Sequence, residues 1–164
     1  MVHDDNKWFL PEDRPYIETF NRYKAADAPT RIDLSLIPEP WVGRLEAPIV
    51  LLSLNPGVAV DDPQWHGSTM LQDHIQKNLR QEVREWPFHY LHPDLKDSPG
   101  GKWWQRCLKA FIDAAGGGEE GARRVAERVV GVEFAGYHSV SFEPLPVTLP
   151  SQRWMFSLLT EKLE

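Results

Sequence analysis

The stretch Pro48-Ile49-Val50-Leu51-Leu52-Ser53-Leu54-Asn55-Pro56-Gly57 decides the expected fold. Its first seven residues are apolar apart from Ser53 and show no polar alternation, which predicts a strand buried on both faces at the centre of a parallel sheet. Asn55-Pro56-Gly57 must end this strand, because proline fixes φ and lacks an N–H group. Ligands of open α/β sheets bind beyond the carboxyl ends of the strands, so Asn55 is well placed for chemistry. In the simpler interpretation Asn55 only closes the turn.

The composition indicates one globular domain. The chain has 164 residues, of which 41% are hydrophobic and 26% are charged, as in ordinary globular proteins. Its net charge of −6 argues against a large nucleic-acid-binding surface, although a basic face can exist on an acidic chain. A cytoplasmic location is expected, because the sequence shows neither a signal peptide nor an apolar stretch long enough to span a membrane.

Metal and disulfide chemistry are not expected from the sequence. Cys107 is the only cysteine, which excludes an intrachain disulfide and a cysteine-based metal site. It falls within a helical pattern, where a buried position is expected. His89 and His92 have the spacing of neighbours on a helix, but Pro87 and Pro93 interrupt a helix there and no acidic partner completes a metal pattern.

Apolar residues at helical spacing predict five helices. Four of them have a polar residue or an acidic pair at the start, and one follows a Ser-Pro-Gly-Gly breaker. They are expected after Asp13, from Ser68 to Trp86, over 102–115, from Glu119, and after Ser151.

A second apolar stretch, residues 129–134, predicts another strand. A helical crossover between two apolar strands is typical of a parallel βαβ unit. The segment Tyr137-His138-Ser139 is therefore expected beside Asn55, although a histidine at such a corner can also be purely structural. In the loop after the first strand, Trp65 can either stack on a planar ligand or pack within the loop.

Two strands are too few for a stable parallel sheet. We therefore expect the chain to be the front portion of a longer protein, with the core incomplete at its C-terminus. The expected division is an N-terminal helix and extended approach over 1–46, an α/β core over 47–162, and a possible tag remnant at 163–164.

The motif Leu54-Asn55-Pro56-Gly57, together with the loop around Trp65 and the helix start Lys102-Trp103-Trp104, resembles the uracil-DNA glycosylase superfamily, in its mismatch-specific and single-strand-selective branches. The resemblance implies a three-layer α/β/α sandwich around a parallel sheet. It also implies a pocket for a base flipped out of DNA. No cofactor and no metal are implied, and the implied partner is DNA that contains a damaged or deaminated base.

The resemblance also implies roles for individual residues. Asn55 matches the residue that positions the attacking water, and the rest of its motif, Leu54, Pro56 and Gly57, would contact the substrate. Trp65 lies near the place of the aromatic residue that stacks on the base. Tyr137 and His138 fall near the base-reading position.

Two features depart from the family pattern. Active members carry a second motif, usually His-Pro-Ser or Asn-Pro-Ser, after the last core strand. Here Leu149-Pro150-Ser151 contains a Pro-Ser pair, but it precedes a helix. Ser53 stands where the first motif usually has glycine.

These departures leave two main hypotheses. One is a glycosylase-like domain that acts on a flipped-out base, and the other is a non-catalytic binding domain with the same fold. The acidic charge and the missing motif favour the second. A small-molecule hydrolase that uses His138 and Ser139 is a third class, but the sequence has no nucleophile elbow.

Overall fold

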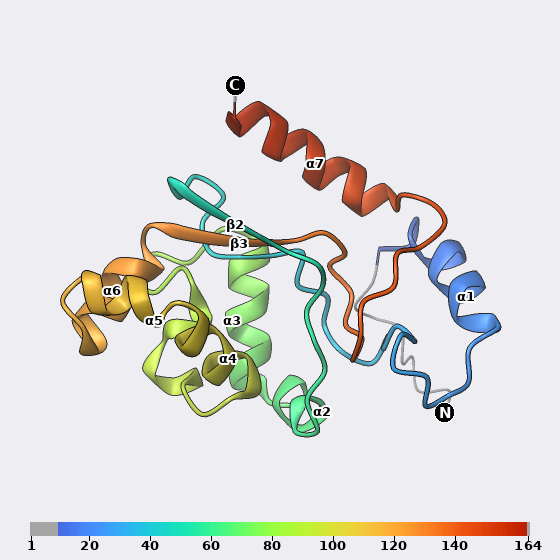
Figure 1. Cartoon of the computed structure of the whole chain (residues 1–164), viewed down its shortest axis with the longest axis horizontal. Coiled ribbons are helices and arrows are strands. Elements are labelled where there is room, and N and C mark those ends of the chain that lie inside the picture. The colour runs from blue at the N-terminus through green and yellow to red at the C-terminus, as the bar shows by residue number, and fades with distance from the viewer. Residues whose placement is uncertain (1–9, 164) are drawn as a thin grey trace. The chain divides into compact units, whose positions relative to one another are not determined.

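A mixed sheet contains every strand in the described part of the chain (Figure 1). The structure is a computed structural model that describes residues 10–163, without the side chain of Leu163. The strands are β1 (Trp41–Val42), β2 (Ile49–Ser53) and β3 (Val129–Glu133), in the order β1-β3-β2. With seven α-helices over the same residues, they confirm the predicted α/β class.

The strands β2 and β3 run parallel, as predicted. The N–H of Ile49 donates to the carbonyl of Arg128 at the start of both strands, and the N–H of Phe134 donates to the carbonyl of Ser53 at the end of both. The strand β1 pairs antiparallel with β3. The prediction of a wholly parallel sheet was therefore wrong, because the short β1 contributes an antiparallel neighbour.

The buried central strand is β3, not β2. All five residues of β3 are buried, whereas Ile49 and Leu52 of β2 are 37% and 74% exposed. Within the described residues β2 pairs only with β3 and forms an edge of the sheet. The prediction of a doubly buried strand at 49–54 was wrong, because an apolar run does not reveal how many neighbours a strand has.

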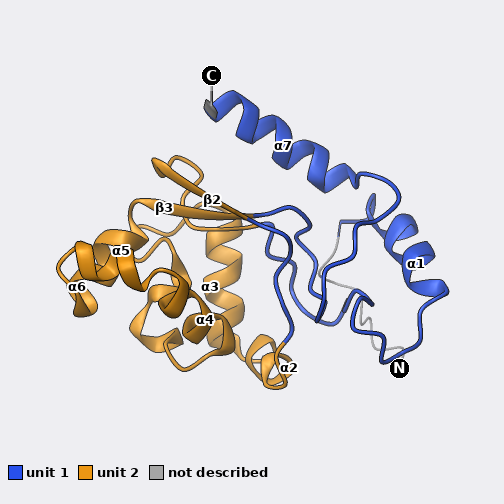
Figure 2. Ribbon diagram, viewed as in Figure 1, with its two compact units in different colours: residues 1–40, 53–58, 133–164 blue, residues 41–52, 59–132 orange. Residues whose placement is uncertain are grey.

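The chain divides into two compact units (Figure 2). Unit 1 comprises Met1–Pro40, Ser53–Val58 and Glu133–Glu164, and unit 2 comprises Trp41–Leu52 and Ala59–Val132.

Unit 2 contains the helices α2 to α6 and two short 3-10 turns. Their bounds are α2 (Asp62–His66), α3 (Thr69–Leu79), α4 (Pro99–Cys107), α5 (Lys109–Ala114) and α6 (Gly118–Ala126), with the 3-10 turns at His89–Leu91 and Pro93–Leu95. Ser68 caps α3 by accepting a hydrogen bond from the N–H of Leu71. Ser98 caps α4 in the same way through Gly101.

Two of the predicted helices have different bounds in the structure. The helix expected to reach Trp86 ends at Leu79, because Gln81 and Trp86 both have positive φ angles, which a helix does not contain. The single helix expected over 102–115 consists of α4 and α5, which are separated at Leu108.

In the core of unit 2, aromatic side chains that lie outside the sheet pack against β3. The rings of Phe88 and Trp104 meet edge to face, with their centroids 4.8 Å apart. A Cβ atom at Gly131 of β3 would lie 2.9 Å from the indole of Trp104, so glycine gives this ring room to approach the strand. Leu108 is buried, but the neighbouring Cys107 is exposed. The expected burial of Cys107 was therefore wrong.

Unit 1 contains α1 (Arg14–Arg22) and α7 (Pro150–Leu163). Its apolar cluster comprises Ile17, Ile32, Tyr137 and Leu149. Asp13 precedes α1 but makes no side-chain cap.

The last helix of unit 1 begins at Pro150, one residue before the predicted cap. The predicted tag remnant at 163–164 falls at the limit of the description, because Glu164 and the side chain of Leu163 lie outside it. Over residues 10–163, no helix combines the length and apolar character needed to cross a membrane.

Candidate functional site

The side chain of Asn55 links the loops that follow β2 and β3. Its Nδ2 donates to Oγ of Ser139 at 2.9 Å and to the backbone oxygen of Ser139 at 3.2 Å. It also donates to the carbonyl of Pro56 at 2.9 Å. The structure therefore brings Asn55 and Ser139 together, as the sequence predicts. No described residue donates to Oδ1 of Asn55, so this oxygen can accept a hydrogen bond from a ligand or water.

His138 is buried and joins three segments of unit 1. Its Nδ1 lies 2.9 Å from the carbonyl oxygen of Gly57, and its Nε2 lies 2.9 Å from that of Ile37. A carboxylate oxygen of Glu39 lies 3.6 Å from the same Nε2. Carbonyl oxygens only accept, so both short contacts are hydrogen bonds only when the imidazole carries two protons. Both ring nitrogens of His138 thus contact the protein backbone.

Glu133 places a buried carboxyl group at the end of β3. Burial raises its pKa to about 7, the nearby hydroxyl of Ser53 opposes this shift, and the carboxylate of Glu39 adds to it. A carboxyl group with a pKa near neutrality can accept or donate a proton at physiological pH. Glu133 is not among the functional residues predicted from the sequence. An acidic residue at the end of an otherwise apolar strand was the available signal.

The hydroxyl of Tyr137 is used inside the fold. It donates to the carboxylate of Asp13 at 2.8 Å, and Asp13 also accepts from the N–H of Ser151 at 3.1 Å. Burial, followed by the Asp13 charge, raises the pKa of Tyr137 far above its usual range. Tyr137 therefore remains a neutral phenol that holds the starts of α1 and α7.

We call Asn55, Glu133, His138 and Ser139, together with Glu39, the strand-end cluster. All five belong to unit 1, and four of them are buried while Asn55 is half-buried. The backbone supports this arrangement, because the N–H of Ala135 donates to the carbonyl of Leu54 at 2.9 Å. The ends of β2 and β3 are therefore level with each other.

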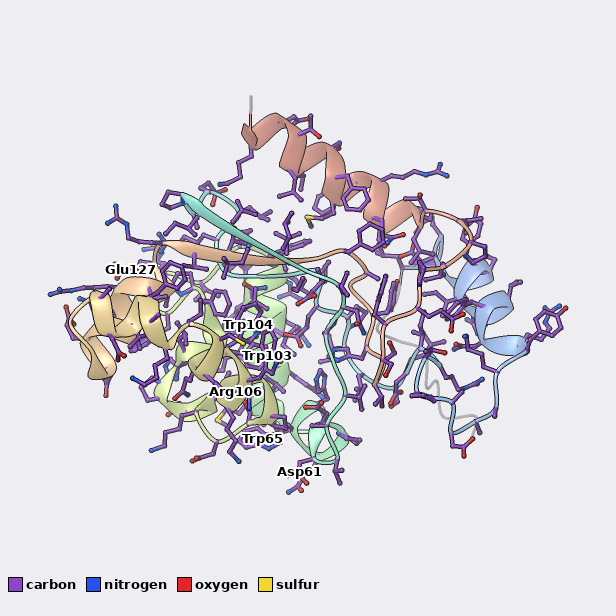
Figure 3. The ribbon with its side chains drawn as sticks, in the orientation of Figure 1. Asp61, Trp65, Trp103, Trp104, Arg106 and Glu127 are labelled. Atoms are coloured by element: carbon purple, nitrogen blue, oxygen red, sulfur yellow. The ribbon has the colours of Figure 1, made fainter. Side chains whose placement is uncertain are left out.

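The other predicted site residues differ in whether they contact the strand-end cluster. The carbonyl of Pro56 accepts a hydrogen bond from the N–H of Ser139, and the carbonyl oxygen of Gly57 contacts Nδ1 of His138. Leu54 is 58% exposed. Trp65 is not in the strand-end cluster: it lies half-buried on α2 in unit 2, and Figure 3 labels it with Trp103 and Trp104 of α4.

Unit 1 also contains a hollow of about 410 Å³. Its lining includes Val58 and Val140, which directly follow Gly57 and Ser139, and residues of the segment 26–34. Neither Asn55 nor His138 lines it. Its volume is within the range of small-molecule sites.

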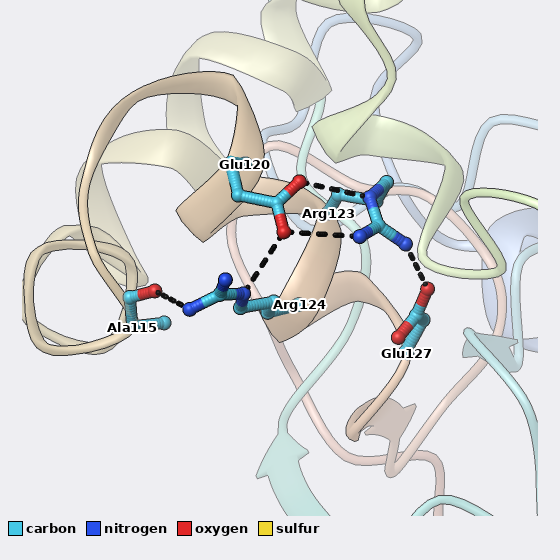
Figure 4. A network of polar contacts seen from close by, with 5 residues as sticks. All are labelled: Ala115, Glu120, Arg123, Arg124 and Glu127. Carbon is cyan, nitrogen blue, oxygen red and sulfur yellow. Dashed lines mark hydrogen bonds and ion pairs between the residues drawn. The ribbon is translucent and has the colours of Figure 1, made fainter.

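Unit 2 has a larger cleft that is rich in arginine. It measures about 900 Å³, and four arginines line it: Arg44, Arg84, Arg124 and Arg128. Arg124 is fixed by Glu120 and by the carbonyl of Ala115 (Figure 4). This cleft is a local basic surface on an acidic chain, of the kind that attracts phosphates.

Arg123, the residue before Arg124 on α6, faces solvent. It is exposed and pairs with Glu120 and Glu127 on the surface of α6 (Figure 4). Exposed pairs of this kind contribute little to stability.

Comparisons with protein-family models, with curated proteins and with solved structures find no match to this chain.

Proposed function

We propose that this chain is a uracil-DNA glycosylase-like domain that receives a flipped-out base at its strand-end cluster. The observation that carries the proposal is the position of Asn55. Its amide nitrogen is fixed by Ser139, while its Oδ1 has no donor among the described residues. An anchored side chain with one open acceptor is suited to orient a water molecule.

The proposed reaction is hydrolysis of the bond between a base and its deoxyribose. The oxygen of the water forms a bond to the anomeric carbon, the bond from that carbon to the base nitrogen breaks, and the base takes its electron pair. Asn55 orients the water through Oδ1. Glu133, whose pKa is raised to about 7, is the candidate acceptor for the proton that the water loses.

The proposal includes a three-layer α/β/α arrangement around the sheet. The parallel pairing of β2 and β3 supports it, with α2 to α6 in the intervening chain, since such crossovers usually cover a sheet face. DNA is the proposed partner because the resemblance of the strand-end motif implies it. The cleft with four arginines is lined by Ile49 and Val129 at the starts of β2 and β3, so it does not belong to the strand-end cluster.

A second candidate function is non-catalytic binding of the same ligand class. The hydrogen bonds of Tyr137 and His138 favour it. The Tyr137 hydroxyl binds Asp13, and both ring nitrogens of His138 lie against backbone carbonyls. Two residues expected to read the base therefore hold the fold together, which leaves fewer donors to stabilise a departing base.

Binding and base release, measured separately, distinguish the two functions. The full chain is mixed at low salt with a labelled single-stranded oligonucleotide that contains one uracil, and with the matched thymine oligonucleotide. Alkaline cleavage of abasic sites measures base release. A catalytic domain binds the uracil strand preferentially and releases uracil. In that case Asn55→Ala abolishes release and retains binding, because the oriented water acts mainly in the transition state.

Val60→Ala, at a position that is 96% exposed, is the control and leaves both measurements unchanged. Uracil-selective binding without release supports the non-catalytic function. Equal affinity for the two oligonucleotides, or no binding to either, would overturn both.

A further inference from the structure

Three potential metal ligands come together in unit 2. His74 lies on α3, and His92 and Asp94 lie at the 3-10 turn Pro93–Leu95. One ligand atom from each residue lies within 4.8 Å of the other two. From the sequence, His89 and His92 are the expected histidine pair, and no acidic partner completes a metal pattern. Folding instead pairs His92 with His74 and provides Asp94 as the acidic partner.

The distances suit a single ion after small side-chain movements. Nδ1 of His92 lies 3.7 Å from Oδ2 of Asp94, and two ligand atoms of a tetrahedral zinc ion lie about 3.4 Å apart. The rings of His74 and His92 have their centroids 4.9 Å apart. Asp94 is exposed, so its side chain is free to rotate toward an ion.

The surroundings orient the histidine rings. The N–H of Asp94 donates to Nδ1 of His92 at 3.1 Å, so this nitrogen has its lone pair on the side of Asp94. Coordination through Nδ1 would replace that hydrogen bond. Trp86 meets the His92 ring edge to face, with centroids 5.7 Å apart.

We propose that His74, His92 and Asp94 form a binding site for a divalent transition metal, with zinc as the best fit. Two imidazole nitrogens and one carboxylate oxygen are a donor set that zinc accepts in tetrahedral sites. Three protein ligands leave the fourth position open to water. The site is independent of the proposed base-binding function, because its three ligands belong to unit 2 and the strand-end cluster belongs to unit 1.

Isothermal titration calorimetry with zinc chloride tests the site on the full chain after treatment with a chelator. The expected result is binding of one zinc ion, with affinity reduced at least about tenfold by His74→Ala and by Asp94→Asn. Asp97→Asn is the matched control, because Asp97 is an exposed aspartate in the same segment, and it leaves the affinity unchanged. Asp94→Asn alters only an exposed group, so it remains decisive if His74→Ala fails to fold.

NMR spectra during the zinc titration provide the second readout. Zinc should shift the ring signals of His74 and His92 together. An absence of zinc binding would overturn the proposal. Zinc binding that retains its affinity in the Asp94→Asn variant, or that leaves both ring signals unmoved, would place the ion elsewhere and also overturn it.

Discussion

Asn55 donates its side-chain amide to both oxygens of Ser139, at 2.9 Å to Oγ and 3.2 Å to the backbone carbonyl. The two residues follow neighbouring parallel strands, so this contact holds the two strand-end loops together. It also leaves Oδ1 of Asn55 as an open acceptor at the end of β2. The contact gives Asn55 a structural role in addition to the proposed chemical one.

The contact predicts energetic coupling between the two side chains. Asn55→Ala and Ser139→Ala should each lower the free energy of unfolding by about 1 kcal/mol, because each removes a hydrogen bond between half-buried and buried polar groups. The double variant should cost clearly less than the sum of the single variants. Denaturant unfolding measures all three. Ser141→Ala, at an exposed position, should have little effect, and strictly additive costs would contradict the contact.

The raised pKa of Glu133 predicts that the stability of the fold depends on pH. Its pKa is raised from 4.5 to about 7, so between these pH values the folded chain retains a proton that the unfolded chain has released. The free energy of unfolding should therefore fall as pH rises through this window, by about 3 kcal/mol, and the contribution of Glu133 should be constant above it.

Glu133→Gln should remove this slope and be more stable than the parent chain at pH 8. Thermal or denaturant unfolding between pH 4 and pH 8 makes the comparison. Glu46→Gln, at an exposed position, should retain the slope. An unchanged slope in Glu133→Gln would show that the carboxyl group titrates normally.

The adjacent residues Cys107 and Leu108 of unit 2 should differ strongly in how much their substitution changes the free energy of unfolding. Leu108→Ala should lower the free energy of unfolding by about 2 to 5 kcal/mol, because Leu108 is almost fully buried. Cys107→Ala should change it by less than about 0.5 kcal/mol, because Cys107 is exposed. A thiol reagent should also label Cys107 in the native protein. Protection of Cys107 until unfolding would contradict its exposed position at the end of α4.

Local sequence signals predicted much of the fold. The apolar run at 129–134 and the turn Asn55-Pro56-Gly57 predicted two parallel strands and the meeting of Asn55 with Ser139, and Ser68 marked the start of α3. These features depend on a few neighbouring residues, or on the general rule that crossovers join parallel strands.

The features that sequence reasoning missed depend on tertiary context. The edge position of β2 depends on which strands pair with it, and the carboxyl group of Glu133 acquires its raised pKa only when the fold buries it. His74 and Asp94 meet only because α3 and the 3-10 turn after His92 pack together. No local spacing in the sequence encodes these three outcomes.

The most direct test of the central claim is an NMR titration of the full chain with a uracil-containing single-stranded oligonucleotide at low salt. The side-chain NH2 signal of Asn55 and the backbone amide signals of Gly57 and Ser139 should shift together, with shifts that decrease as salt is added. The matched thymine oligonucleotide should give weaker shifts. If these three signals stay unmoved at saturating uracil oligonucleotide, the strand-end cluster does not receive a base and the account is wrong.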